Sequence, residues 1–529
     1  MTIFIAGILK IILLVSALVY LLLIAFPVVR NGKEKLVQYF GYGVAILSVF
    51  AYFNFGFFYF PTMISNWDTF HYYMGAKYFQ ELGYTDLYRA GAAATKEVNP
   101  ASPVTTIRNL TTFELEQVND EVIADVKGKF TTERWEQFLN DFRFYNDRDK
   151  NLWAGLFTDH GYNGMPLQIL WAGAIFNLVP LNLISLFLLV SVDWVLAAVA
   201  LAFVFKAFGQ KAGTMATIFF CLNFLTRYRF TGGSLFRFDW ICALLIFVCC
   251  YRMKQWWGAG VALAFAVFSR FFPLVFAGIV VAKFVTSLVT KNKDVLPGLK
   301  KTLLAFLATS VVFGLLSVVV LGRGSTFSDL TKRLQLISGR PFTNSVGVAV
   351  VDYYRGEQDG KDFGQGAAPW EQWIKDVAQR RSALPVILGI VAVLLGIFIF
   401  LKTDVLFSLL LAIPVLFFFS LMPNYYYLFL VLYFIVVWKK DGQVRPTAAV
   451  SMVLFLIITI VSYILEHAIS FPLRQYYLIS VLLMFSFLFS LLAEVVVFLP
   501  ESVKKRVLHT FQKSSRSLFR LLKRVNAHD

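Results

Sequence analysis

Long apolar runs separated by short polar connections alternate along most of this chain. The first run covers residues 3–29, and the second covers residues 37–64 after a short basic connection. An α-helix rises about 1.5 Å per residue, so about 20 apolar residues cross the hydrocarbon core of a bilayer. The first run is too long for the core of a signal peptide and lacks a basic leader and an Ala-x-Ala-like cleavage site. We therefore expect it to be a retained membrane helix.

Eleven further apolar runs follow, and several of the central ones are short enough to be broken or half-embedded. Together the runs predict an all-α polytopic membrane protein with about 13 transmembrane helices. The later runs are residues 183–205, 213–225, 240–251, 257–268, 272–289, 302–321, 385–401, 405–422, 426–438, 447–469 and 476–498.

Lysine and arginine gather in alternate connections between these runs. When the loop that holds Arg30, Lys33 and Lys35 is placed inside, every later inside connection also carries Lys or Arg, as the positive-inside rule requires. The predicted topology in the cell membrane therefore has an outside N-terminus and an inside tail. The later inside connections are residues 206–211, 252–254, 290–301, 402–404, 439–445 and the tail from residue 501.

This topology places two long hydrophilic stretches on the outer face. The first contains residues 133–142, whose apolar side chains recur at helical spacing and predict a juxtamembrane helix on the membrane surface. The second combines charges, Gly-rich turns and aromatic pairs, which is typical of a lid or docking loop. The predicted segments are the N-terminal helices (1–64), the first outer loop (65–182), the central helices (183–321), the second outer loop (322–384), the C-terminal helices (385–499) and a basic cytoplasmic tail (500–529), expected as an amphipathic helix on anionic lipid.

Composition supports the same class. Hydrophobic residues make up 58% of the 529 residues and charged residues 15%, with a mean hydropathy of +0.67. A soluble chain of this length would expose a very large apolar surface. The net charge of +17 follows from the basic connections and anionic lipid rather than from nucleic acid. All four cysteines lie in apolar runs, so neither a disulfide framework nor a zinc site is predicted.

One carboxylate stands just past the outer end of the second apolar run. Asp68 lies among aromatic residues and three positions before His71. An ionisable group at the mouth of a membrane helix is costly and usually marks chemistry at the boundary between water and lipid. A plain alternative is that Asp68 caps the helix predicted over residues 69–82, because Asp is among the best N-cap residues.

Three short motifs follow one another through the first half of the chain. Residues 71–88, preceded by Asp68, end in Gly-Tyr-Thr-Asp-Leu-Tyr; residues 162–167 read Tyr-Asn-Gly-Met-Pro-Leu; and residues 269–274 read Ser-Arg-Phe-Phe-Pro-Leu. In order and membrane placement they resemble the first outer loop, the Tyr-x-Pro-Pro-Leu-like element and the Lys-x-x-Pro element of the GT-C superfamily of polyprenyl-phosphate-dependent glycosyltransferases, and are closest to glycosyltransferase family 87. The second motif has only one proline, and Arg270 replaces Lys in the third. The second half of the chain matches only in hydropathy.

The resemblance implies an inverting membrane glycosyltransferase that moves mannose or a similar sugar from a polyprenyl-phosphate donor to a glycan, lipid or protein acceptor at the outer face. Asp68 matches the acidic position of the family and is expected to be the general base. The departing phosphate needs cations, and the planar fork of arginine suits phosphate. Arg270 is the leading candidate for binding the phosphate, by resemblance, and the further candidates are Arg229, Arg237 and Arg227, which lie in an outside loop.

Other interpretations of these side chains stay open. The arginines could snorkel to lipid headgroups, and Arg237 could pair with Asp239. His71, one turn beyond the carboxylate, either orients the acceptor or has only an ordinary role at the protein surface. Asp159 and His160 form a runner-up acid–base pair or a solvated pair in a loop.

Further polar residues stand near or within the apolar runs. Asp193 is expected to have a stabilising role, with an arginine as a partner. Gly232 and Gly233 either let backbone amides approach the phosphate or form a turn. Glu466 and the stretch 424–427 could line an acceptor or lipid site, although an aromatic belt explains the tyrosines equally well.

Two other function classes use the same features: a transporter or flippase of lipid-linked saccharides, and an oligosaccharide polymerase or ligase. Carriers usually show paired half-repeats with binding at the midplane, which this chain lacks, and a polymerase or ligase would rely on outer arginines rather than on an Asp base. The expected partners are a polyprenyl-phosphate sugar, its acceptor and membrane lipids. No compact carboxylate cluster demands a metal ion, but some members of the superfamily bind a divalent cation, so that cofactor is left open.

Overall fold

The computed structural model describes residues 3–25, 32–59, 63–101, 104–321, 326–356, 359–360, 367–439 and 442–503. Within these residues the chain is all-α apart from two short antiparallel strand pairs and one isolated bridge. Six of the described helices are long and apolar enough to cross a membrane. They are α1 (Ile3–Ala25), α10 (Leu183–Phe208), α16 (Leu296–Leu321), α20 (Leu384–Lys402), α23 (Pro446–Ala468) and α24 (Pro472–Phe498).

The other predicted spans form helices that are shorter, less apolar or interrupted. The expectation of about 13 full spans is therefore not confirmed, although most predicted runs coincide with helices to within a few residues. These helices are α2 (Glu34–Tyr52), α11 (Gln210–Leu222), α13 (Asp239–Arg252), α14 (Trp256–Ser269), α15 (Leu274–Val289), α21 (Val405–Leu409) and α22 (Ala412–Phe419), and α9 (Pro166–Leu178) adds an apolar helix within the predicted first outer loop.

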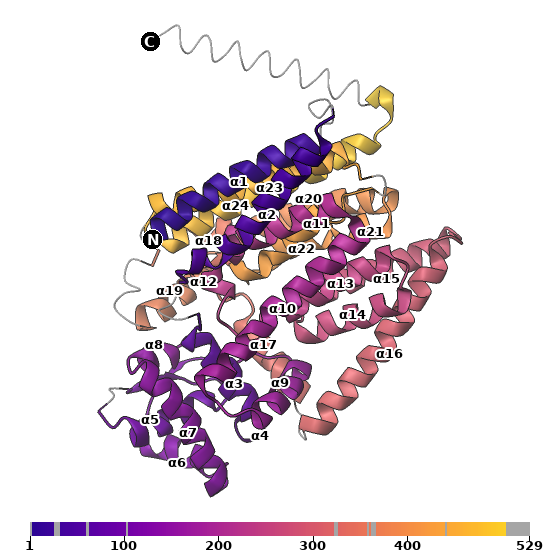
Figure 1. Ribbon diagram of the computed structural model, residues 1–529. Coiled ribbons are helices and arrows are strands. Elements are labelled where there is room, and N and C mark those ends of the chain that lie inside the picture. Colours follow the sequence, from indigo (N-terminus) through magenta and orange to yellow (C-terminus); the bar gives the residue numbers. More distant parts are fainter. Residues whose placement is uncertain are drawn as a thin grey trace, which may run out of the picture.

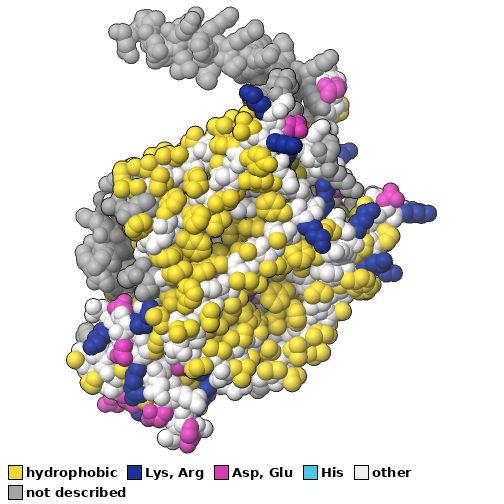
Figure 2. All heavy atoms as spheres, in the orientation of Figure 1, with side chains coloured by type: hydrophobic (Ala, Val, Ile, Leu, Met, Phe, Trp, Pro, Cys, Tyr) yellow, Lys and Arg dark blue, Asp and Glu magenta, His cyan; other side chains and the backbone are white. Residues whose placement is uncertain are grey.

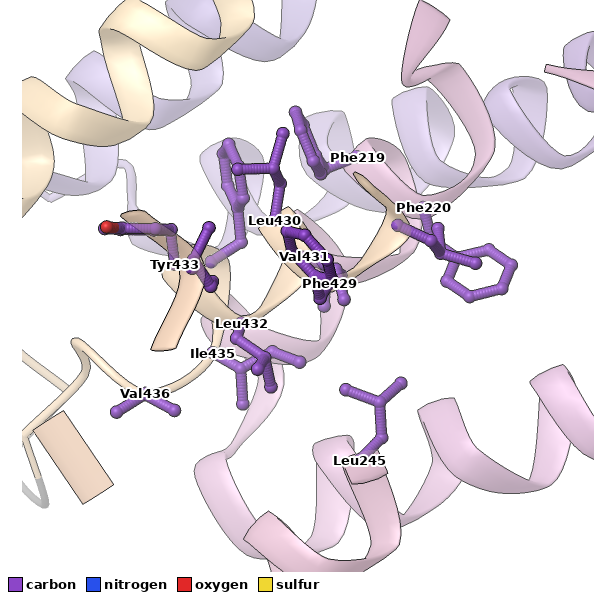
Figure 3. Close-up of a cluster of buried hydrophobic side chains, with 14 of the residues drawn as sticks. Phe219, Phe220, Leu245, Phe429, Leu430, Val431, Leu432, Tyr433, Ile435 and Val436 are labelled. Carbon is purple, nitrogen blue, oxygen red and sulfur yellow. The ribbon is translucent and has the colours of Figure 1, made fainter. Parts of the chain in front are cut away.

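Two predicted spans have the wrong form. The second run ends as a helix at Tyr52, because Asn54, Phe55 and Gly56 all adopt positive φ angles that an α-helix cannot contain. The run at 426–438 is a 3-10 helix, η5 (Asn424–Phe434), rather than a transmembrane α-helix. Figure 3 shows its Leu, Val and Phe side chains packed among α11 and α13. Irregular backbone at this depth is tolerated because protein covers it on all sides.

The helical body is held together by close helix contacts. Helix α1 packs against α2 and α23, and α23 packs against α24, so the N-terminal helix lies beside the last two described helices (Figure 1). Helix α14 packs between α13 and α16. A Cβ at Gly260 would stand 2.3 Å from the carbonyl oxygen of Thr302, so only glycine permits this approach of α14 to α16.

A polar lobe, residues 63–164, forms a second hydrophobic core below this body (Figure 1). Helix α7 contributes the apolar face that the sequence predicts, but Phe138 and Phe142 are fully buried in the core of the lobe. The prediction that this helix lies on the membrane surface is therefore wrong. The lobe consists of α3 (Asn66–Lys77), α4 (Phe79–Leu82), α5 (Leu87–Val98), β1 (Thr106–Arg108), β2 (Leu115–Gln117), α6 (Asp120–Lys127), α7 (Thr132–Arg148) and α8 (Leu152–Leu156).

The second hydrophilic stretch packs onto both the lobe and the helical body. It contains α17 (Thr326–Ile337), β3 (Ser345–Val346), α18 (Val348–Tyr353) and α19 (Ala367–Gln379). Strand β3 pairs with β4 (Met422–Pro423), directly before η5. The guanidinium of Arg333 on α17 donates to the carbonyl oxygen of Leu110, 2.7 Å away in the lobe. This stretch therefore ties the lobe to the helical body.

The surface shows the same division. On the face that Figure 2 shows, hydrophobic side chains cover the middle, and charged side chains gather at two opposite ends. One end is the lobe, and the other holds the connection between α15 and α16 (Figure 1). Arg30 and the predicted amphipathic tail at 504–529 lie outside the described residues.

Candidate active site

Asp68 lies in the first turn of α3, but it does not cap the helix. Ser65 is the N-cap, and its hydroxyl oxygen accepts from the backbone N–H of Asp68 at 3.3 Å. The same hydroxyl donates to Oδ2 of Asp68 at 3.1 Å. The cap interpretation of Asp68 is therefore wrong, and its carboxylate is left at the positive end of the helix dipole.

The other carboxylate oxygen of Asp68 forms an ion pair with the guanidinium of Arg237. The side chain of Asp68 is 23% exposed, and that of Arg237 is 10% exposed. The alternative pairing of Arg237 with Asp239 is wrong. Removing one partner of an ion pair this poorly solvated destabilises the protein, because the other charge stays buried without a partner.

Asp193 fixes the backbone that carries Arg237. Its two carboxylate oxygens accept from the backbone N–H groups of Arg237, at 2.7 Å, and Phe238, at 3.0 Å. The expected stabilising role is thus found, but the carboxylate binds the start of α13 rather than an arginine side chain. Phe236, just before, has a φ of +53°, so the turn is constrained on both sides.

Tyr72 joins Arg237 to the predicted phosphate-binding Arg270. It lies four positions after Asp68 and so shares a face of α3 with it. Its hydroxyl accepts from Nη2 of Arg270 at 3.0 Å, and its ring centroid lies 5.8 Å from the guanidinium carbon of Arg270 and 5.3 Å from that of Arg237. One tyrosine therefore lies between the two arginines, and of these Arg237 contacts the carboxylate of Asp68.

Arg270 follows the last residue of α14 and points toward α9. Its Nη1 donates to Oε1 of Gln168 at 2.7 Å, and Nε2 of Gln168 donates to Oδ2 of Asp239 at 3.2 Å. The glutamine thus links Arg270 to a carboxylate without a direct ion pair. Arg270 is only 6% exposed, so its guanidinium is almost fully buried.

Aromatic side chains, two of them tyrosines, cover the other side of the Arg237 guanidinium. The ring of Tyr425 lies 4.7 Å from the guanidinium carbon of Arg237 and 4.6 Å from the ring of Tyr426, which in turn lies 4.9 Å from Phe272. These three aromatic residues are half-buried, as are Asp68 and Tyr72. The partly exposed surface here is therefore polar and aromatic, and the two arginines are more deeply buried than these residues.

Gly233 docks the loop before α13 onto α3. Its carbonyl oxygen accepts from the N–H of Ser65 at 2.9 Å, and a Cβ on Gly233 would stand 2.4 Å from the carbonyl oxygen of Met63. Its φ of +69° also favours glycine. Gly233 therefore makes a close approach to the chain at 63–65, and the approach of backbone amides at Gly232 and Gly233 to a phosphate stays a prediction.

Arg227 and Arg229 make their contacts elsewhere. Nη2 of Arg227 lies 2.8 Å from Oε1 of Glu466, and Arg229 stacks 4.7 Å from the ring of Tyr59. Neither is brought to Tyr72, so two of the four predicted arginines, Arg237 and Arg270, form the site with Asp68.

His71 is buried and fully bonded. Its Nδ1 donates to the carbonyl oxygen of Trp67 at 2.9 Å, so its Nε2 accepts from the hydroxyl of Tyr88 at 2.8 Å. That hydroxyl also accepts from the N–H of Gly161 at 2.7 Å. Burial lowers the pKa of His71 from its usual 6.5, although the charge of Asp159 acts to raise it. His71 holds the lobe together and has no nitrogen free for an acceptor.

Asp159 and His160 support α3 from behind. Oδ1 of Asp159 accepts from Nδ1 of His160 at 2.8 Å, and Oδ2 accepts from the indole N–H of Trp67, also at 2.8 Å. Burial acts to raise the pKa of Asp159, but His160 outweighs it and holds the pKa below its ordinary value. The imidazole of His160 packs between Phe113 and Phe342. The pair thus lies in a loop, as one of the two interpretations expects, with the Asp159 side chain 34% exposed, and it also contacts Trp67, the residue before Asp68.

Sequence reasoning did not assign roles to Tyr72 and Gln168 at this site, and it considered Tyr425 only as part of a stretch that could line an acceptor or lipid site. The i,i+4 spacing of Tyr72 from Asp68 was a usable signal, but Gln168 and Tyr425 join through long-range contacts. Among the described residues, no three His, Cys, Asp or Glu side chains converge to hold a metal ion. The chain matches no family model, no curated protein and no solved structure.

Proposed function

We propose that this protein is a membrane glycosyltransferase that uses a polyprenyl-phosphate sugar and inverts the anomeric centre. The observation that carries the proposal is the placement of Asp68, Tyr72, Arg237 and Arg270 in one connected set at the junction of the lobe and the apolar helices. A partly exposed carboxylate paired with one nearly buried guanidinium, with a second guanidinium bonded to the neighbouring Tyr72, suits a reaction that needs one base and one anion site.

The proposed step is a single displacement. The acceptor hydroxyl attacks the anomeric carbon, its proton passes to the carboxylate of Asp68, and the bond between that carbon and the lipid-phosphate oxygen breaks. The phosphate leaves with the bonding electron pair, and Arg270 and Arg237 stabilise its charge. A phosphate reaching these arginines must pass Tyr72 and Tyr425, so we expect the two rings to move when the donor binds.

Arg237 has a double role in this proposal. It holds the base in the free protein, and it is the nearest guanidinium that can turn to the phosphate as charge develops. Asp193 and Gln168 orient the two arginines through the contacts described above, and the proposed membrane face of the reaction is the outer one.

The test is incubation of the purified protein with a panel of polyprenyl-phosphate sugars. We expect slow release of free sugar from one donor, lost in Arg270→Ala and kept in Arg143→Gln, a matched change at an exposed arginine of the lobe. Loss of one anion-stabilising donor typically costs about 10²–10³ in rate. Absence of turnover with every donor would overturn the proposal, and sugar movement across sealed vesicles without bond cleavage would favour a transporter.

A further inference from the structure

A second basic cluster lies apart from the candidate active site. It consists of Lys10 on α1 and of Arg227 and Arg229 in or beside α12 (Tyr228–Thr231), and we call it the α1–α12 cluster. Arg227 and Arg229 flank the same ring, with their guanidinium carbons 4.9 and 5.6 Å from the centroid of Phe230. Lys10 lies behind them, 5.7 Å from the ring of Tyr463 and hydrogen-bonded to Asn54.

The cluster holds more cations than carboxylates. Glu466 on α23, one turn from Tyr463, pairs with Arg227 at 2.8 Å. Neither Lys10 nor Arg229 forms an ion pair with a carboxylate in the part of the chain that the structure describes. The three cations and one carboxylate therefore leave a net charge of +2. Lys10 is only 4% exposed, and Arg227 is only 6% exposed. Uncompensated charge beside lipid is costly, so an anionic ligand would be strongly favoured here.

The contacts of the cluster point to a ligand that arrives from the lipid. Lys10 lies seven residues into α1, about 10 Å from the start of the helix at the rise of 1.5 Å per residue. On the same helix Phe4 and Ile8 are exposed, at 56% and 39%, as expected for side chains that face lipid. Arg229 is exposed and Phe230 half-buried, so the guanidinium can meet a headgroup at the end of the bilayer nearest the lobe.

The surroundings separate the cluster from the candidate active site. Tyr228, between the two arginines in sequence, packs on Tyr52 and Phe53, with ring centroids 5.5 and 5.9 Å away. Its hydroxyl donates to the carbonyl oxygen of Met63 at 2.5 Å. These aromatic residues stand between the α1–α12 cluster and the start of α3, which carries Asp68.

We propose that the α1–α12 cluster binds the phosphate of an anionic phospholipid in the leaflet on the side of the lobe. Arg229 makes the first contact by donating paired hydrogen bonds to the phosphate oxygens, and Lys10 and Arg227 supply charge from behind. This inference stands independently of the proposed glycosyl transfer.

The test is lipid retention measured by native mass spectrometry on the full-length protein from nanodiscs that contain phosphatidylglycerol, phosphatidylcholine or both. We expect phosphatidylglycerol to be retained preferentially, with retention at least about threefold lower in Arg229→Gln, since one charge near an anionic surface contributes about 1 kcal/mol. Arg229 is exposed, so this variant folds without disturbing the core. Glu466→Gln removes the competing carboxylate and is expected to raise retention.

Arg143→Gln provides the control, because Arg143 is an exposed arginine of the lobe on α7. It should retain phosphatidylglycerol like the unchanged protein. Equal retention in Arg229→Gln and Arg143→Gln would overturn the proposal. So would displacement of the lipid by millimolar inorganic phosphate, because the site would then bind free phosphate rather than a headgroup.

Discussion

Arg237 forms an ion pair with Asp68 across 169 positions of sequence, and it joins the start of α13 to the start of α3. The carboxylate belongs to the lobe, whereas the guanidinium belongs to the apolar body. The pair therefore fixes the lobe against the apolar body at the point where the proposed chemistry occurs.

Replacing Arg237 with lysine keeps the charge but removes the planar fork. We expect transfer to fall by about 10²-fold, because a single ammonium cannot hold Asp68 and meet the phosphate with the same geometry. The measurement is the rate of sugar transfer from the active donor, with the midpoint of thermal unfolding as a check on folding. A rate equal to that of the unchanged protein would show that the fork is not used.

Asp193 is expected to act through the backbone of Arg237 and Phe238. Asp193→Ala leaves two buried N–H groups without an acceptor, each at a cost of about 1–3 kcal/mol, so the unfolding midpoint should fall sharply. Asp193→Asn keeps one acceptor oxygen, so its unfolding midpoint should lie between those of Asp193→Ala and the unchanged protein. If alanine and asparagine behave alike, the carboxylate does not hold this turn.

Gly233 can be compared with Gly209, which also has a positive φ, +85° against +69°. Alanine at Gly209 meets nothing within 4 Å and should pay only backbone strain, about 1–3 kcal/mol, because its φ of +85° and ψ of 179° lie in a region populated almost only by glycine. Alanine at Gly233 adds a clash with the carbonyl oxygen of Met63. Thermal unfolding of the two variants should therefore rank Gly233→Ala as clearly less stable, and the reverse order would contradict the docking of this loop on α3.

His71 is expected to make stability depend on pH. Its pKa in the folded protein is lowered, so below about pH 6.5 the unfolded chain binds a proton that the folded protein does not. The stability that the neutral form of His71 contributes is fully present above pH 6.5. As the pH falls below this value, the free energy of unfolding decreases by at most about 1.4 kcal/mol per pH unit.

The comparison for this effect is His71→Gln, which keeps a donor and an acceptor but does not titrate. Unfolding midpoints between pH 5 and pH 8 should fall more steeply for the unchanged protein than for the variant. Identical slopes would show that His71 is not held neutral.

Much of the apolar body could be predicted because continuous hydropathy is enough to locate a long helix. The runs at 183–205 and 447–469 became α10 (Leu183–Phe208) and α23 (Pro446–Ala468). Hydropathy alone cannot tell a helix from a buried irregular segment, so η5 was predicted as a transmembrane helix. The regular spacing of α7 revealed its apolar face, but not whether lipid or the lobe covers it.

The site was predicted in part for a similar reason. Asp68, Arg237 and Arg270 carry charges that are conspicuous next to apolar runs. Their pairing, however, depends on contacts between distant parts of the chain, which spacing cannot reveal. Arg227 has the same local appearance as Arg237, and only the position of Glu466 on α23 directs it elsewhere.

The most direct measurement is single-turnover transfer by Asp68→Asn with the active donor, together with the dissociation constant of that donor. The account predicts a rate about 10²–10⁴ lower, with donor binding within a fewfold of the unchanged protein, because the amide cannot take the acceptor proton. Asp147→Asn, at an exposed carboxylate of α7, should transfer normally. Transfer by Asp68→Asn at the unchanged rate would contradict the account.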